Sequence, residues 1–248
     1  MFEISLSDTS LIRNSIPIIA EIIDEGVFKI DKNGLSLISP DRTMVAVVDF
    51  KLLSSAFDKF KVEEERELGL NLGNLVAILK RVGPSDKLTI KSGKENKLEI
   101  IIEGNGKRKF EIPLIDISVE KPPIEQLNFT AEAELDSSIL EQGIADADVV
   151  SDSVIFETED DLFRMLAEGD VSSTELEIKK GEEGLLKLKT DGKVKARYPL
   201  EYLKKMIKAA KLSKQAELKF GTDFPMRLDF KVLDKISLGF VLAPRVEE

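Results

Sequence analysis

The chain has no cysteine and no histidine among its 248 residues. Their absence excludes disulfides, Cys/His zinc sites, thiolate nucleophiles, imidazole general bases and a Ser-His-Asp triad. An enzyme with this sequence would have to use carboxylates, lysines, hydroxyls or tyrosine. We therefore expect a protein that is not an enzyme and that has no cofactor and no metal.

A long hydrophobic run is also missing. The longest apolar stretch near the start, IPIIAEII, contains Pro17 and Glu21 and is far shorter than the ~20 residues that span a bilayer. The chain opens with MFEISLSD, which alternates like a strand rather than like a signal peptide. We expect a cytoplasmic protein with no membrane partner, no signal peptide and no transmembrane segment.

Negative charge outnumbers positive charge overall, but one segment has a local excess of lysines. The formal net charge is −10, yet PLEYLKKMIKAAKLSK (199–214) carries five lysines and one glutamate, 5 − 1 = +4. On a helical wheel, Lys204, Lys205, Lys208 and Lys211 lie opposite an apolar side formed by Leu200, Leu203, Met206, Ile207 and Ala210. Lysines without interleaved aromatics suit a duplex phosphate backbone and do not read sequence. The alternative is that the lysine-bearing face of this helix is exposed to solvent and binds nothing.

The chain repeats itself internally. A shift of 128 residues aligns two blocks without a gap and superposes, among others, Leu72, Leu75, Leu79 and Lys80 on Leu200, Leu203, Ile207 and Lys208. The segment DTSLI (8–12) likewise aligns with DSSIL (136–140). Such a repeat indicates two domains of one fold.

Each copy divides again into a strand, a helix and three strands. In the first copy the pattern predicts strands at 2–8, 26–30, 35–39 and 44–50 with a helix after Asp8-Thr9-Ser10, and then strands at 67–72, 87–92, 97–104 and 107–115 with a helix at 73–82. The segment DISVEKPPIEQLN contains Pro122-Pro123 and predicts an extended connector. We expect an α+β protein with domains at 1–115 and 129–248, joined by the connector 116–128.

Several segments match a known family. They are GLNLGNLVAILK (69–80), EIPLID (111–116), SDSVIF (151–156), LEYLKKMIKAA (200–210) and the ending FVLAPRVEE. With the duplicated plan and the proline-bearing connector, they make the chain resemble, end to end, the sliding clamps of the proliferating cell nuclear antigen (PCNA) family, particularly the archaeal type.

The resemblance implies the DNA clamp fold, a homotrimeric ring that encircles double-stranded DNA without reading its sequence. Its helices would line the hole and its sheets the rim, and the clamp would act in replication and repair at the nucleoid. The implied partners are DNA polymerase, the clamp loader (replication factor C), flap endonuclease and DNA ligase. The implied DNA-facing residues are Arg13, Lys80, Arg81, Lys204, Lys205, Lys208 and Lys211. The third helix departs from the family, because Glu141, Gln142, Ala145 and Asp146 occupy its polar face.

The resemblance also implies a pocket for partner peptides and a subunit interface. The pocket positions are Met44, Val45, Val47, Leu127, Pro225, Phe240, Ala243, Pro244 and Val246. Pro244 should stop the last strand, so that the tail beyond it runs free. The interface would pair 107–114 with 172–179 of a neighbour, through Lys107, Arg108, Lys109, Phe110, Ile112, Glu175 and Glu177.

Two alternatives stay open from the sequence. The acidic run ETEDD (157–161) is typical of an exposed hairpin turn, but it also offers the oxygen ligands of a Mg²⁺ enzyme. A subunit of a heterotrimeric clamp, or of a checkpoint clamp that signals DNA damage, is the second alternative.

Overall fold

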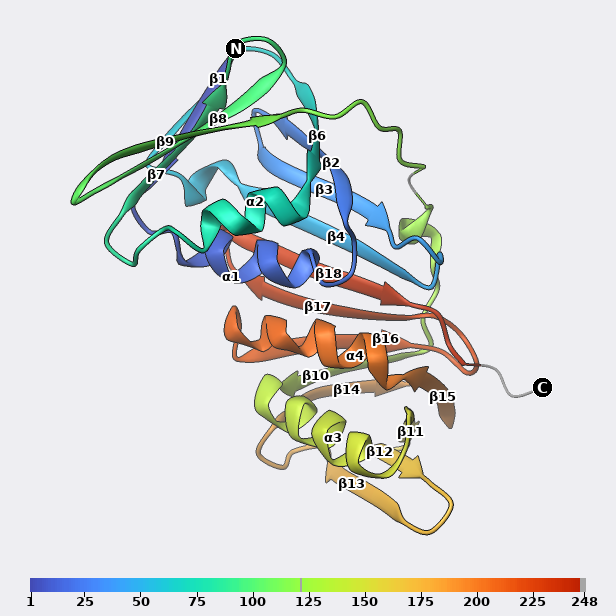
Figure 1. The fold of residues 1–248 in the computed structure, drawn as a ribbon. Coiled ribbons are helices and arrows are strands. Elements are labelled where there is room, and N and C mark those ends of the chain that lie inside the picture. The colour runs from blue at the N-terminus through green and yellow to red at the C-terminus, as the bar shows by residue number, and fades with distance from the viewer. Residues whose placement is uncertain (121, 246–248) are drawn as a thin grey trace. The chain divides into compact units, whose positions relative to one another are not determined.

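The computed structural model describes residues 1–120 and 122–245, and the chain in it divides into two compact units (Figure 1). Unit 1 comprises 1–42, 48–121 and 232–238, and unit 2 comprises 43–47, 122–231 and 239–248. Across the described residues, no helix is both long enough and apolar enough to cross a membrane.

Unit 1 contains two layers of antiparallel strands. The first follows the order β5-β1-β7-β8-β9 and the second the order β4-β3-β2-β6. The strands are β1 (Phe2–Leu6), β2 (Glu25–Asp31), β3 (Gly34–Pro40), β4 (Ala46–Leu53), β5 (Lys59–Val62), β6 (Arg66–Asn71), β7 (Lys87–Ser92), β8 (Lys97–Gly104) and β9 (Gly106–Pro113).

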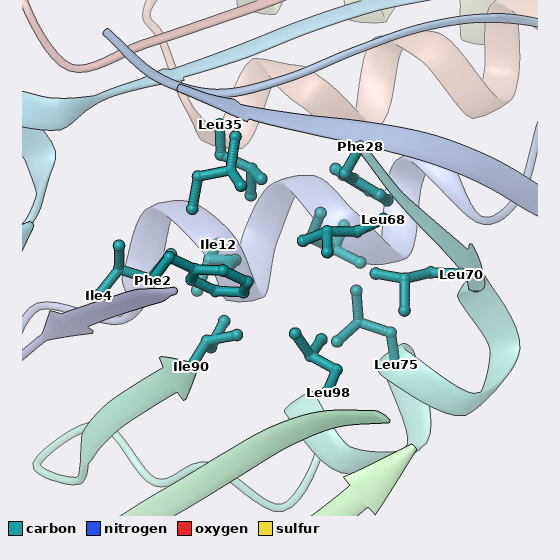
Figure 2. Close-up of a pocket in the computed structure, with 12 residues that line it drawn as sticks. Phe2, Ile4, Ile12, Phe28, Leu35, Leu68, Leu70, Leu75, Ile90 and Leu98 are labelled. Atoms are coloured by element: carbon teal, nitrogen blue, oxygen red, sulfur yellow. The ribbon is translucent and has the colours of Figure 1, made fainter. Parts of the chain in front are cut away.

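The helices of unit 1 are α1 (Ser10–Ile19), α2 (Leu72–Leu79) and the short 3₁₀ helix η1 (Ser54–Ala56). Asp8 accepts a hydrogen bond from the Ser10 backbone N–H, and Asn71 accepts one from Asn74 N–H, so each N-terminus has a polar partner. The helices and both layers enclose an apolar core with a void of about 20 Å³ that is lined by apolar side chains. Figure 2 shows Ile12, Phe28 and Leu98, from three different elements, pointing toward it.

Unit 2 repeats this plan. One layer follows the order β14-β10-β16-β17-β18 and the other the order β13-β12-β11-β15. The strands are β10 (Ala131–Asp136), β11 (Ser153–Glu159), β12 (Leu162–Glu168), β13 (Ser173–Lys179), β14 (Leu185–Thr190), β15 (Val194–Pro199), β16 (Gln215–Phe220), β17 (Met226–Val232) and β18 (Ile236–Leu242). The helices are α3 (Ser137–Val150), α4 (Leu200–Met206) and the 3₁₀ helices η2 (Ile124–Gln126) and η3 (Ile207–Lys211).

The two units correspond strand for strand, which confirms the α+β fold class and the internal duplication. The sequence pattern did not predict β5 and β14, which occupy equivalent places in the two copies and pair with β1 and β10. Both lie at the edge of a layer, and β5, KFKV, is only four residues long. Their conformation depends on the partner strand, which local sequence does not reveal.

The lysine-rich helix is shorter than the wheel predicted. It is α-helical only to Met206, and then tightens into η3. A 3₁₀ helix turns about 120° per residue instead of 100°. The prediction that Ala210 is the packed alanine is therefore wrong: Ala209 is fully buried, whereas Ala210 is partly exposed.

Candidate nucleic-acid and partner interfaces

The lysine-bearing helix packs beside α3 within unit 2 (Figure 1). Leu200, Leu203 and Met206 are buried, which leaves the lysines of α4 at the surface. Because η3 has three residues per turn, Lys208 and Lys211 lie one above the other along it. The segment therefore presents a short row of cations that can contact successive phosphates.

Lys204 and Lys205 have carboxylate partners within the chain. Lys204 Nζ lies 2.8 Å from Asp148 Oδ1 and 3.0 Å from Asp148 Oδ2, a contact that joins α4 to α3. Lys205 Nζ lies 3.3 Å from Glu201 Oε1, one turn earlier on the same helix, and 5.2 Å from the centre of the Tyr202 ring. The sequence reveals the second pair by its spacing of four residues but not the first.

The polar face of α3 is acidic at the surface. Glu141, Gln142, Ala145 and Asp146 are all exposed, and nothing basic occurs among the residues of this helix. Among the described helices of unit 2, the basic residues therefore lie on α4 and η3.

The candidate basic residues of unit 1 are spread over two helices. Arg13 is half-buried on α1, and the exposed Lys80 and Arg81 follow the last residue of α2. The two helices contact one another. The Arg81 carbonyl accepts a hydrogen bond of 3.0 Å from Arg108 Nη1, which ties the end of α2 to β9.

The predicted peptide-pocket residues that the structure describes all fall within the ranges of unit 2, which include Val47 at the start of β4, although most of that strand belongs to unit 1. The Ala243 backbone N–H donates to the Val45 carbonyl at 2.9 Å, so two of the segments come together. Met44 has a φ of 60° and is 62% exposed, which makes it available to a partner. Phe240 is fully buried and is therefore not itself exposed to a partner, and Val246 lies outside the described residues.

The chain end differs in part from the prediction. The strand β18 ends at Leu242, as a proline at 244 demands. The prediction that the chain beyond it runs free is wrong at Arg245. The Arg245 N–H donates to the Arg197 carbonyl at 2.7 Å, and its guanidinium lies 2.6 Å from Asp152, a pairing that lowers the pKa of that carboxyl.

A polar hollow of about 280 Å³, which sequence reasoning missed, lies along this chain end. Lys195, Arg197 and Arg245 line it together with Asp223. Lys195 and Arg197 share one face of β15, because side chains on a strand alternate, and that alternation was the available signal.

Both predicted interface segments are edge strands of their layers, β9 in unit 1 and β13 in unit 2. Their unpaired backbone groups are available for another strand. Their charges are already engaged: Lys109 lies 2.8 Å from Glu99 and 3.3 Å from Glu111, which raises the lysine pKa. On β13, Glu177 lies 2.8 Å and Glu175 3.6 Å from Arg164.

Of the acidic run 157–161, the residues 157–159 lie on β11, and Asp160 and Asp161 form the turn into β12, so the predicted exposed turn is shorter than the run. Glu157 is buried and lies 3.0 Å from Arg164 and 3.4 Å from Lys193. Among residues 1–120 and 122–245, no group of three acidic side chains is placed to hold a metal ion. Glu157 and Glu159 of this run both form ion pairs with Arg164 and Lys193.

Comparisons with known proteins cover the whole chain. The family model of the N-terminal domain of proliferating cell nuclear antigen matches residues 1–121, and that of the C-terminal domain matches residues 123–245. The "DNA polymerase sliding clamp" proteins of Thermococcus gammatolerans and Pyrococcus furiosus are 37% and 36% identical to this chain over 247 residues, covering 100% of it and 99% of each relative.

The fold is similar to two solved archaeal structures. PCNA from Thermococcus kodakaraensis matches with a TM-score of 0.92 at 29% identity, over 99% of this chain and 100% of that one. The PCNA2-PCNA3 complex from Sulfolobus tokodaii contains a chain that matches with a TM-score of 0.90 at 25% identity, over the same shares.

Proposed function

Because this chain belongs to the proliferating cell nuclear antigen family, we propose that it is a DNA sliding clamp, a ring that encircles duplex DNA and tethers DNA polymerase to it. The observation that carries the proposal is similarity to named sliding clamps over the full length of the chain, at up to 37% identity. Tethering replaces repeated bimolecular rebinding by a high local concentration of polymerase. The work is mechanical, and the chain performs no chemical reaction in it.

We propose that three copies form the ring, with β9 of one copy paired to β13 of the next. This arrangement would remove two exposed sheet edges from each chain, and edges left open invite aggregation. The domains would run over 1–115 and 129–248, with 116–128 as the connector. A mixed ring is the alternative, since the similar Sulfolobus tokodaii structure is a complex of PCNA2 with PCNA3.

The proposed DNA-facing residues are the cations on the helices. Surface electrostatics reach about 10 Å at ordinary salt, so a local row of lysines attracts phosphate despite a net charge of −10. Lys208 and Lys211 of this row lie on η3, and Lys204 and Lys205 extend it along α4. Arg13, Lys80 and Arg81 would contribute from unit 1.

Charge reversal tests this assignment. The triple variant Lys204→Glu, Lys205→Glu and Lys208→Glu should shorten the products of a clamp-dependent polymerase in a processivity assay. A matched triple reversal of exposed lysines away from the helices, at Lys32, Lys94 and Lys189, should leave product length unchanged. If the two triple variants shorten the products equally, the lysines on α4 and η3 are not the DNA-facing residues.

We further propose that Met44, Val45, Val47, Leu127, Pro225, Ala243, Pro244 and Val246 form the docking surface for short peptides of polymerase, clamp loader, flap endonuclease and ligase. Leu127 is half-buried in the connector, so Leu127→Ser removes apolar surface there at little cost to the fold. The variant should bind a partner peptide at least tenfold more weakly by calorimetry while keeping its solution mass. Undiminished affinity would place the docking surface elsewhere.

A further inference from the structure

We propose that Asp148 weakens the grip of this chain on duplex DNA, because it competes with phosphate for the ammonium group of Lys204. The inference rests on the proposed function, since it requires α4 to face DNA. It adds a regulator of that contact: an acidic residue on the neighbouring helix, placed to set how tightly the ring holds its DNA.

The contact itself is close and joins two different elements. Lys204 Nζ donates to both oxygens of Asp148, at 2.8 and 3.0 Å, across the line where α4 packs beside α3. Both helices are fixed by buried residues on their opposite sides, Leu140 and Ile144 on α3 and Leu203 on α4. The pair is therefore held in reach by the fold and does not depend on a loop.

The pair is also open to exchange. The side chains of Lys204 and Asp148 are 48% and 40% exposed, so water and a phosphate group can both reach the ammonium. Exposed ion pairs of this kind are weak, and they break readily when a competing anion arrives. Asp148 thus lowers the occupancy of a phosphate contact by Lys204 without abolishing it.

Lys204 differs in this respect from its neighbour. Lys205 pairs with Glu201 on its own helix at 3.3 Å, in the common spacing of four residues, and this carboxylate is 76% exposed. The Asp148 carboxylate comes from outside the helix and contacts the lysine through two oxygens. The Asp148 pair couples the acidic helix α3 to the basic segment.

The consequence for DNA binding is measurable. A lysine that contacts a phosphate releases about 0.9 counterion, which steepens the plot of log affinity against log salt concentration by that amount. A Lys204 that stays on Asp148 contributes nothing to this slope. Removing the Asp148 charge should therefore raise the affinity and steepen the slope together.

The chain offers a matched control on the same helix. Asp146 is exposed, two residues earlier on α3, and no hydrogen bond or ion pair of its side chain occurs in the part of the chain that the structure describes. Asp146→Asn changes the charge as Asp148→Asn does. Any difference between the two variants reports the contact with Lys204 and not the general field of the helix.

The experiment titrates a fluorescein-labelled 30-base-pair duplex with the full chain, up to millimolar protein, and follows anisotropy between about 50 and 200 mM salt. We expect Asp148→Asn to bind about two- to fivefold tighter than Asp146→Asn, the range set by an exposed ion pair, with a steeper salt slope. The double variant Asp148→Asn with Lys204→Gln should lose the gain in affinity. The Lys204→Gln substitution should lower the affinity less in the unmodified chain than in the Asp148→Asn variant.

Equal affinities and equal slopes for the two asparagine variants would overturn the role of Asp148 and leave the clamp proposal intact. A gain that survives Lys204→Gln would overturn it as well. Failure of every variant, the unmodified chain included, to bind duplex at the lowest salt would overturn the contact between α4 and duplex on which the role of Asp148 rests, whereas retention on circular DNA tests the clamp proposal separately. Circular dichroism melting of each variant should match the unmodified chain, since all the altered side chains are exposed.

Discussion

Lys109 and Phe110 are neighbours on β9, and we predict that they contribute very different free energies to closure of the proposed ring. Side chains alternate along a strand, so Lys109 lies on the face away from the helices and Phe110 on the face toward α2, with Arg108 and Ile112. If β9 pairs with β13 of another copy, both residues lie at the boundary. They should contribute very differently to it.

The difference follows from their present contacts. Lys109 already has carboxylates at 2.8 and 3.3 Å, so a further exposed partner would add about 0–1 kcal/mol. Phe110 is half-buried in the single chain. Covering the rest of its ring would contribute about 1–2 kcal/mol, part of the 1.5–3 kcal/mol for burying a whole phenylalanine side chain. That corresponds to a factor of about 5–30 in the subunit dissociation constant.

Light scattering on a sizing column, over a dilution series from high to low micromolar, measures this directly. The unmodified chain should run near three times its mass of 27.6 kDa. Phe110→Ser should shift the dissociation midpoint about 5–30-fold toward higher concentration, and Lys109→Glu should shift it less than fivefold. Phe57→Ser, a half-buried phenylalanine away from both edges, is the control.

The reverse order would refute the reasoning. If Lys109→Glu dissociates the assembly and Phe110→Ser does not, charge pairing between the edges closes the ring, and the intrachain partners of Lys109 are irrelevant to it.

Three further predictions concern stability, each measured by denaturant unfolding. A side chain at Gly239 would overlap the Asp229 carboxylate, so Gly239→Val should break the buried Arg–Asp pair of β17 and cost about 3–5 kcal/mol; a loss under 1 kcal/mol would contradict the packing. Burial alone would raise the pKa of Glu217, but two lysines, Lys231 among them, lower it to about 2 from its ordinary 4.5. The stability from this group is thus present above pH ~4.5 and lost as the pH falls toward 2, so Glu217→Gln should destabilise the protein at pH 7 and become neutral near pH 2; a pH-independent effect would exclude the ion pairs. Leu98→Ala, which enlarges the void of unit 1, should cost about 2–5 kcal/mol, and a neutral result would mean that the core collapses around it.

Much of the architecture could be predicted because the chain repeats it. The 128-residue shift places α2 (Leu72–Leu79) on α4 (Leu200–Met206), and the layers of the two units share one strand order. Local patterns were strong where a strand or helix has one apolar face, as in KLTIKS, which forms β7. The additional strands β5 and β14 do not belong to the repeated plan of one strand, one helix and three strands, so the repeat did not predict them.

The candidate sites were harder to predict because they depend on contacts between distant residues. Lys204 and Asp148 are 56 residues apart, and only the packing of α4 beside α3 brings them together. The segment IKAAK contains good helix formers, so the change to 3₁₀ geometry at Ile207 has no signal in its composition. The hydrogen bond from Arg245 to the Arg197 carbonyl on β15 likewise joins residues that only the folded chain brings together.

The central claim is that this protein encircles DNA, and topology tests it most directly. The protein would be loaded by a clamp loader and ATP onto nicked circular plasmid, isolated by gel filtration, and followed after the plasmid is cut once with a restriction enzyme. A ring that slides should remain on the uncut circle and leave the linear molecule from its ends. Equal retention on circular and linear DNA would contradict the claim, because it would mean that the protein binds DNA without enclosing it.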